Sequence, residues 1–245
     1  WDISFDFPND PDLIIELLLS DIWPKAVDEV DIVKTEDDER FRAKSIIRNM
    51  LPDLRGKRFL NVGDSPLIAK LASNIAAESE HHFAAQLMKP STGGSYDVAL
   101  VYDIIDHIPT IKHHLLLESL INKMHPGATI VCRCHPWTGP HGGHCYNRIN
   151  KAYAHLFLGQ KVLEYQDFEV EKIHDPTIYY DRLFKSVNLD IVDVMIFRND
   201  IPDLLRSQDV LDYLSEKINY PAEVLYKTMQ YIYIDYHLKI PTHSS

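Results

Sequence analysis

The stretch that decides the fold is Gly56-Lys-Arg-Phe-Leu-Asn-Val-Gly-Asp-Ser-Pro66. Its residues 58–62 predict a short buried strand, and Gly63-Asp-Ser predicts a turn. Pro66 suits the first position of a helix, because proline lacks the amide hydrogen that this position leaves unpaired. We therefore expect a strand at 58–62, a glycine turn, and a helix from Pro66 to about Ala77.

Strands and helices alternate on the C-terminal side of this stretch. Hydrophobic periodicity predicts strands at 82–87, 96–102, 128–134, 189–197 and 229–238, and helices at 110–124, 147–158, 176–187 and 207–218. Two helices, at about 9–20 and 40–50, are predicted upstream. This order favours an α/β fold with a mainly parallel sheet and flanking helices. We expect an N-terminal helical extension, residues 1–55, and an α/β domain, residues 56–245.

Composition narrows the class of protein. The chain has 245 residues, 45% of them hydrophobic, and a net charge of −11. We expect no general nucleic-acid binding, because neutralising phosphates needs clustered Lys and Arg. No apolar run approaches the roughly 20 residues that cross a bilayer, so no membrane partner is expected. Three cysteines, all between 132 and 145, favour a reducing, cytoplasmic compartment.

Two further stretches extend the pattern of residues 56–66. They are Ser95-Tyr-Asp-Val-Ala-Leu-Val-Tyr-Asp-Ile-Ile-Asp-His-Ile-Pro109 and Leu120-Ile-Asn-Lys-Met-His-Pro-Gly-Ala-Thr-Ile-Val131. A helix-then-strand pattern follows at 180–194. Together the stretches resemble the first, fourth and fifth strands, and a C-terminal unit, of the class I S-adenosylmethionine-dependent methyltransferase family. The resemblance covers about residues 56–198 and implies a Rossmann-like, shortened class I methyltransferase fold.

The resemblance implies a cofactor, S-adenosyl-L-methionine, and methyl transfer to an unknown substrate. It places cofactor contacts in two turns, at Asn61, Gly63, Asp64 and Ser65 and at Asp103 and His107. The alternative for the first turn is a helix cap made by Asp and Ser. The alternative for His107, beside Asp106, is a hydrogen-bonded packing histidine.

The chain departs from the family pattern in two places. Asp64 and Ser65 follow Gly63, so the second glycine of the usual G-x-G loop is absent. About 33 residues separate Gly63 from Tyr96, which leaves room for one short strand where the family has two strand–helix units. The family's ribose-binding acid has no counterpart beyond the candidates Glu78 and Glu80. Both departures favour the alternative function, a catalytically inactive methyltransferase-like structural or interaction protein.

The histidine loop, residues 135–146, belongs to the densest cluster of reactive side chains, namely Cys132, Cys134, His135, His141, His144 and Cys145. The spacing is not that of a zinc knuckle or ribbon, so no metal is predicted. We expect the loop to lie over the carboxyl ends of the strands, with His144 as proton acceptor and His141 and His135 beside it.

Other residues of the histidine loop suggest ligand contact as well. Trp137 has a ring suited to stacking on a planar ligand, and Gly139, Gly142 and Gly143 would let the backbone approach one. The alternative is an ordered loop that caps the following helix. The loop also resembles virus-encoded methyltransferase-like proteins, which implies a protein partner or viral assembly and a location in the host cytoplasm or virion.

Overall fold

The computed structural model describes residues 10–28, 32–89, 95–164 and 170–242. The chain forms two compact units, each built from separate segments. The sheet unit comprises Val33–Cys134, Thr177–Met195 and Ile234–Ser245, and the helical unit comprises Trp1–Ile32, His135–Pro176 and Ile196–Tyr233. The predicted boundary at residue 55 is a different division of the chain and stays a prediction.

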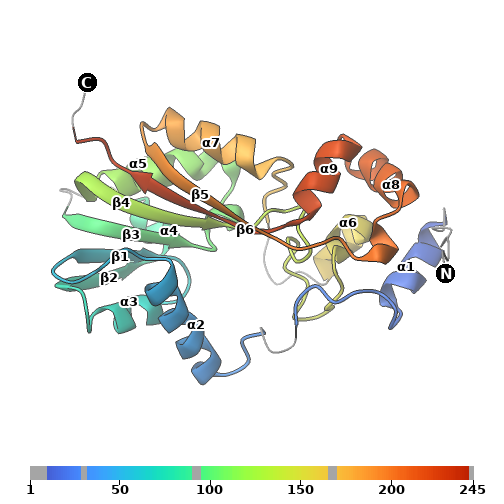
Figure 1. The fold of residues 1–245 in the computed structure, drawn as a ribbon, viewed down its shortest axis with the longest axis horizontal. Helices are drawn as coiled ribbons and strands as arrows, with labels where there is room; N and C mark the ends of the chain where they lie inside the picture. Colours follow the sequence, from blue (N-terminus) through green and yellow to red (C-terminus); the bar gives the residue numbers. More distant parts are fainter. Residues whose placement is uncertain (1–9, 29–31, 90–94, 165–169, 243–245) are drawn as a thin grey trace. The chain divides into compact units, whose positions relative to one another are not determined.

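The sheet has six strands in the order β2-β1-β3-β4-β6-β5 (Figure 1). Their bounds are β1 Arg58–Val62, β2 Glu78–His82, β3 Tyr96–Tyr102, β4 Met124–Cys134, β5 Asp190–Arg198 and β6 Tyr231–Lys239. Strands β2, β1, β3 and β4 pair in parallel, and β6 pairs antiparallel to β4. This mixed sheet with flanking helices confirms the predicted Rossmann-like α/β fold.

Helices of the sheet unit lie on both faces of the sheet (Figure 1). One face carries α2 (Glu36–Asn49) and α3 (Leu67–Ala72), whose apolar side chains form a core with Phe59, Leu100 and Val131. The other carries α5 (His113–Ile121) and α7 (Pro176–Ser186), where the Phe184 and Tyr236 rings pack 4.9 Å apart. The short helix α4 (Ala84–Leu87) follows β2. Both faces of the central strands are therefore covered, which explains why these strands read as continuous apolar runs.

The helical unit has its own core. Its helices are α1 Pro11–Leu19, α6 Ala154–Leu158, α8 Gln208–Ile218 and α9 Ala222–Met229. The indole of Trp23 is 2% exposed, packs edge-on against Phe157 at 4.9 Å, and donates to the carbonyl oxygen of Ala152 at 2.8 Å. Nothing in the described parts of the chain is a helix both long and apolar enough to cross a membrane.

The structure corrects several predicted elements. Residues 82–87 are not a strand: β2 ends at His82, and α4 follows. The helix expected at 147–158 is reduced to α6, which begins after Tyr153 in a left-handed conformation (φ 59°). Helix α3 ends at Ala72 rather than Ala77, and α9 was not predicted. The strands at 58–62 and 96–102 are confirmed with their predicted bounds.

Candidate functional site

The topology of the sheet points to one crevice. From the central strand β1 the chain passes first to β2 on one side and later to β3 on the other. In doubly wound sheets, ligands bind beyond the carboxyl ends of the strands where the strand order reverses in this way. Here that point lies between the ends of β1 and β3, where Val62 pairs with Val101. Of the predicted cofactor residues, Gly63 directly follows β1, Asp103 directly follows β3, and Asn61 lies within β1.

The turn after β1 is held tightly. The amide of Gly63 donates to the carbonyl oxygen of His82 at 3.3 Å, and a Cβ on Gly63 would lie 3.1 Å from the carbonyl oxygen of Tyr102. Glycine is therefore favoured here, because any side chain would crowd the neighbouring chain. Ser65 does not cap α3, because its hydroxyl donates to Glu39 at 2.5 Å and the N-cap, Pro66, has no side-chain bond. Asp64 is exposed.

A polar pair, the buried Asn61 and the half-buried His81, joins β1 and β2 at their carboxyl ends. Asn61 is 1% exposed, and its side-chain Nδ2 lies 2.8 Å from the carbonyl oxygen of Ser65 and 2.9 Å from Nδ1 of His81. The other polar atoms of the pair, Asn61 Oδ1 and His81 Nε2, are buried without a hydrogen-bond partner among the residues that the structure describes. Buried polar atoms without partners are rare in folded proteins, and they mark a place where a ligand or water completes the network.

The turn after β3 has an unusual backbone. Asp103 adopts a left-handed conformation with φ 50°, which is uncommon for a residue other than glycine. The 3-10 helix Ile105–His107 follows, and Nε2 of His107 lies 3.5 Å from Oδ2 of Asp106. Asp106 is 1% exposed. This geometry matches the predicted pairing of His107 with a carboxylate, and it fits a packing role as well as a ligand-binding one.

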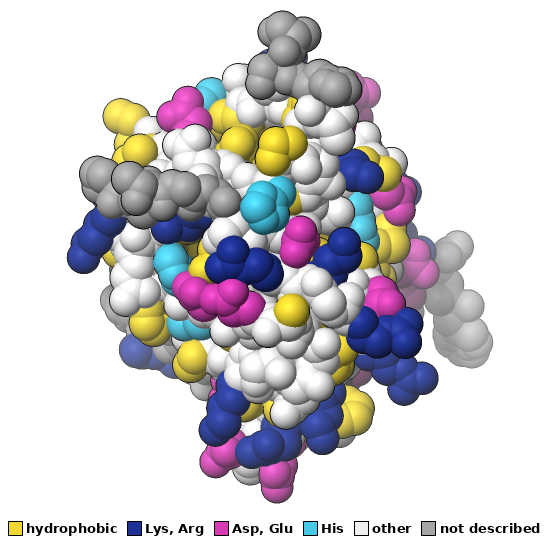
Figure 2. Space-filling model, turned by 90° about the vertical axis from the view of Figure 1, so that its left-hand side faces the viewer, with side chains coloured by type: hydrophobic (Ala, Val, Ile, Leu, Met, Phe, Trp, Pro, Cys, Tyr) yellow, Lys and Arg dark blue, Asp and Glu magenta, His cyan; other side chains and the backbone are white. Residues whose placement is uncertain are grey.

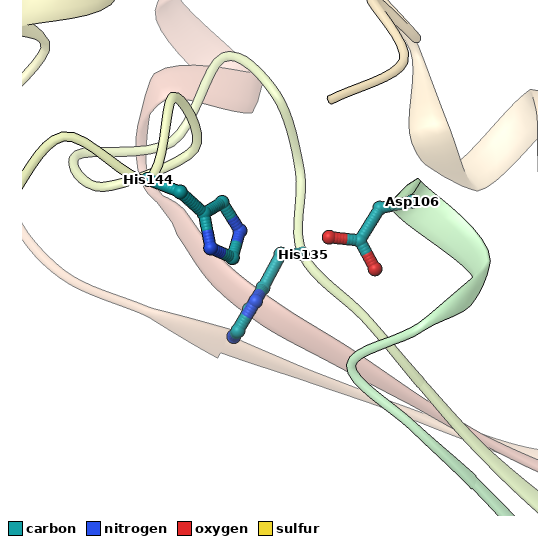
Figure 3. A group of neighbouring side chains, drawn as sticks. All are labelled: Asp106, His135 and His144. Carbon is teal, nitrogen blue, oxygen red and sulfur yellow. The ribbon is translucent and has the colours of Figure 1, made fainter. Parts of the chain in front are cut away.

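In the helical unit, the three histidines of the histidine loop lie together. The ring of His135 is 5.1 Å from that of His141 and 5.4 Å from that of His144, between centroids. Figure 3 shows His135 and His144, and a ring nitrogen of His135 lies within 4.8 Å of a ring nitrogen of His144. The third residue drawn, Asp106, belongs to the sheet unit. The loop thus brings the three imidazoles together, and the role predicted for them stays a prediction.

Other loop residues fill the interior of the helical unit. Trp137 is 6% exposed and packs edge-on against the ring of His155 at 5.7 Å. A Cβ on Gly139 would lie 2.3 Å from the carbonyl oxygen of Tyr231, and one on Gly143 would lie 2.2 Å from Cβ of His155. The prediction that Trp137 stacks on a ligand and that these glycines admit one is therefore wrong. Both serve the packing of the chain on itself.

The cysteines are free thiols that lie in different units. Cys132 and Cys134 share one face of β4, with their sulfur atoms 3.8 Å apart, and burial raises the pKa of Cys134 well above its usual range. Cys145 belongs to the helical unit, where its thiol donates to the carbonyl oxygen of Gly143 at 3.3 Å. Within each unit, the thiols have the surroundings of small buried side chains.

Charges of both signs are interspersed on the face of the molecule drawn in Figure 2. On that face Lys and Arg side chains lie beside Asp and Glu rather than gathering into one basic stripe. A phosphate backbone binds where basic side chains cluster. The expectation of no general nucleic-acid binding remains a prediction for the molecule as a whole.

Comparison with known proteins gives structural likenesses only. No family model matches the chain, and no curated protein matches it in sequence. An S-adenosylmethionine-dependent methyltransferase from Archaeoglobus fulgidus superposes with a TM-score of 0.49 at 16% identity, over 82% of this chain and 94% of that one. One from Methanosarcina mazei gives 0.45 at 10% identity, over 81% and 98%.

A third likeness is to a larger protein. Phosphoethanolamine N-methyltransferase 2 from Haemonchus contortus, in complex with phosphomonomethylethanolamine and S-adenosylhomocysteine, gives a TM-score of 0.46 at 11% identity. The superposition covers 83% of this chain and 53% of that one.

Proposed function

We propose that this protein is an S-adenosylmethionine-dependent methyltransferase whose cofactor binds at the carboxyl ends of β1 and β3. The observation that carries the proposal is the Asn61–His81 pair beside the topological switch point, because its two unpartnered polar atoms suit a polar ligand. The motifs at 56–66, 95–109 and 120–131 supply the resemblance that names the cofactor.

The residues at this edge fit a nucleoside more readily than an anion. Asn61 and His81 offer uncharged polar atoms, and Gly63 lets two neighbouring strand ends approach. Asp64, the middle residue of this turn, disfavours a carboxylate there because of its own negative charge. When bound, S-adenosylmethionine would supply a methyl group activated by its sulfonium. The chain's own task is to position the acceptor and remove its proton.

We propose His144 as the proton acceptor, with His141 and His135 as its neighbours. His144 is 7% exposed, and both other rings lie within the same short loop. The loop begins at the residue after β4, so the chain itself leads from the carboxyl edge of the sheet into the histidines. Neutral imidazole is the side chain best suited to accept a proton near pH 7.

Calorimetry with S-adenosylmethionine and S-adenosylhomocysteine on the purified protein tests the cofactor. We expect both to bind, and Gly63→Val to weaken binding because the added side chain meets the carbonyl oxygen of Tyr102. Circular dichroism checks that the variant remains folded. Unchanged affinity in a folded variant would reject the site, and no binding to the wild type would reject the function.

The alternative is a catalytically inactive methyltransferase-like protein that serves as a structural or interaction module, in a viral particle or another complex. The absence of the family's second glycine after Gly63 and the single strand, β2, that the chain forms after β1 and before β3 favour it. Transfer of a labelled methyl group to a panel of small nucleophiles, peptides and nucleic acids separates the two. An active enzyme loses transfer in His144→Ala and keeps it in the matched control His125→Ala, an exposed histidine. Background transfer in the wild type, with cofactor bound, supports the module.

A further inference from the structure

The two edge strands of the sheet differ in length and in side chains. At one edge, β2 has five residues, and its sequence Glu-Ser-Glu-His-His is polar. At the other edge, β5 has nine residues, of which six are apolar and none is buried. Val192 is 65% exposed and Phe197 is 40% exposed. Short strands and charged side chains protect a sheet edge from pairing with another chain. β2 has this protection, whereas β5 presents a long apolar edge.

The backbone of β5 shows which residues face outward from the sheet. The amide of Val194 donates to Oδ1 of Asp193 at 2.9 Å, so it points away from β6. The amide of Asn199, just after β5, donates at 2.8 Å to the carbonyl oxygen of Gln230, just before β6. The end of β5 therefore lies beside the start of β6, and residue 199 faces β6. Because backbone groups of successive residues point to opposite sides, the even-numbered residues of β5 face outward.

This orientation agrees with one register for pairing β5 with a second copy of itself. Two identical strands pair antiparallel about a two-fold axis, with outward-facing residues opposite each other. When the axis passes through Val194, all nine residues are paired, and only this register pairs them all. Asp190 of each copy then lies opposite Arg198 of the other, and Val192 lies opposite Ile196. Full overlap, outward-facing backbone groups and opposite charges thus coincide in one register.

We propose that the protein forms a homodimer in which the β5 strands of two copies pair antiparallel about Val194. The occupant of this edge is a second copy because β5 is complementary to itself, with opposite charges at its ends and apolar side chains between them. The carbonyl oxygen of Val194 in the second copy accepts the amide hydrogen that Asp193 accepts in the single chain. One hydrogen bond replaces another, and apolar side chains leave water. The dimer does not depend on the proposed function.

Sedimentation velocity of the full chain, from about 1 μM to about 1 mM, measures the association. One pair of strands is at the small end of specific interfaces, so we expect a dissociation constant of about 10–100 μM. A wild type that remains monomeric at about 1 mM would show that β5 does not pair with itself.

Reversed charges test the register. Asp190→Arg sets like charges opposite each other at both ends of the paired strands, and so does Arg198→Asp. Each variant alone should associate about tenfold more weakly or worse. An equimolar mixture of the two should form a heterodimer about as tightly as the wild type, because each cation then lies opposite an anion. Glu118→Arg, at an exposed acid of α5, makes the same change in net charge outside β5 and should leave the dimer intact.

The mixture decides between this register and any other contact. If the wild type dimerises but neither reversed charge weakens it, or if the mixture does not associate, the two copies meet elsewhere and the proposal is wrong. Thermal melting shows whether the variants fold, since Arg198 also lies over the ring of Tyr231 at 5.2 Å. Should Arg198→Asp not fold, Val194→Pro decides. It removes an amide hydrogen that faces away from β6, so a dimer retained in this variant would overturn the proposal.

Discussion

Two glycine-bearing loops follow strands of the same sheet, and they use glycine differently. After β1, a Cβ added to Gly63 would meet one carbonyl oxygen at 3.1 Å. Two polar atoms near this turn, Asn61 Oδ1 and His81 Nε2, have no hydrogen-bond partner in the part of the chain that the structure describes. After β4, a Cβ added to Gly139, Gly142 or Gly143 would lie within 2.3 Å of another atom of the chain. We propose that these polar atoms beside the first loop contact a ligand. The second uses its glycines to pack, and the function proposed for it depends on its histidine side chains.

The same substitution in the two loops should therefore have unequal effects, and the larger belongs to Gly142→Ala. The new Cβ would lie 2.3 Å from the carbonyl oxygens of both Pro136 and Trp137. Two backbone groups must move, so we expect the free energy of unfolding to fall by roughly 3 kcal/mol. Urea unfolding followed by tryptophan fluorescence measures it, since Trp23 and Trp137 both belong to the helical unit.

Gly56→Ala is the control for this substitution. A Cβ there meets nothing within 4 Å, and only the left-handed backbone (φ 69°) opposes it, at about 1 kcal/mol. If Gly142→Ala costs no more than Gly56→Ala, the histidine loop is not packed as the structure describes. Its glycines would then again be candidates for ligand contact.

The sequence predicts those elements of the fold that have a clear local pattern of apolar residues. Strands β1 and β3 were predicted with their bounds because buried parallel strands read as continuous apolar runs. Strand β2 was misplaced because it is an edge strand of sequence Glu-Ser-Glu-His-His, with no apolar signal. The helix α9 was missed although Pro221 precedes it, and Leu225 and Met229 recur at helical spacing.

The candidate site divides in the same way. The turn at Gly63 and the cluster of His135, His141 and His144 were predicted, because each is a short run of characteristic residues. The contact between Asn61 and His81 was not, because it depends on the register that sets Asn61 opposite His81, 20 residues away. A histidine doublet at the end of a strand was the one sequence signal. The packing role of Trp137 likewise depends on residues distant in the chain.

A second prediction concerns pH and the helical unit. Burial lowers the pKa of His155 to about 3, and the hydrogen bond to the carbonyl oxygen of Trp137 opposes this shift only in part. Between this pKa and the ordinary value near 6.5, the unfolded chain binds a proton that the folded chain does not. The contribution of His155 to stability should therefore be fully present above pH 6.5 and be lost as the pH falls toward 3.

The size of this effect follows from linkage. At pH 5 the contribution of His155 is a loss of about 2 kcal/mol relative to pH 7.5. Urea unfolding at the two pH values measures it in the wild type and in His155→Gln, which keeps a donor for Trp137 without a titrating ring. Between pH 7.5 and pH 5, the free energy of unfolding of the variant should fall by about 2 kcal/mol less than that of the wild type. An identical pH dependence in both proteins would mean that His155 is not buried as a neutral ring.

The smallest expected effect is that of Gly63→Ala on stability. Its Cβ would lie 3.1 Å from the carbonyl oxygen of Tyr102, a crowding that a shift of a few tenths of an ångström relieves. Alanine also restricts the unfolded chain, which stabilises the fold by about 0.4–1 kcal/mol and offsets the crowding. We expect the free energy of unfolding to change by about 1 kcal/mol or less, against the much larger loss in Gly142→Ala. Urea unfolding of both variants under one condition measures the difference. An equally large loss in Gly63→Ala would show that the turn after β1 is packed as rigidly as the histidine loop, and the contrast between a ligand-binding loop and a self-packed loop would have to be abandoned.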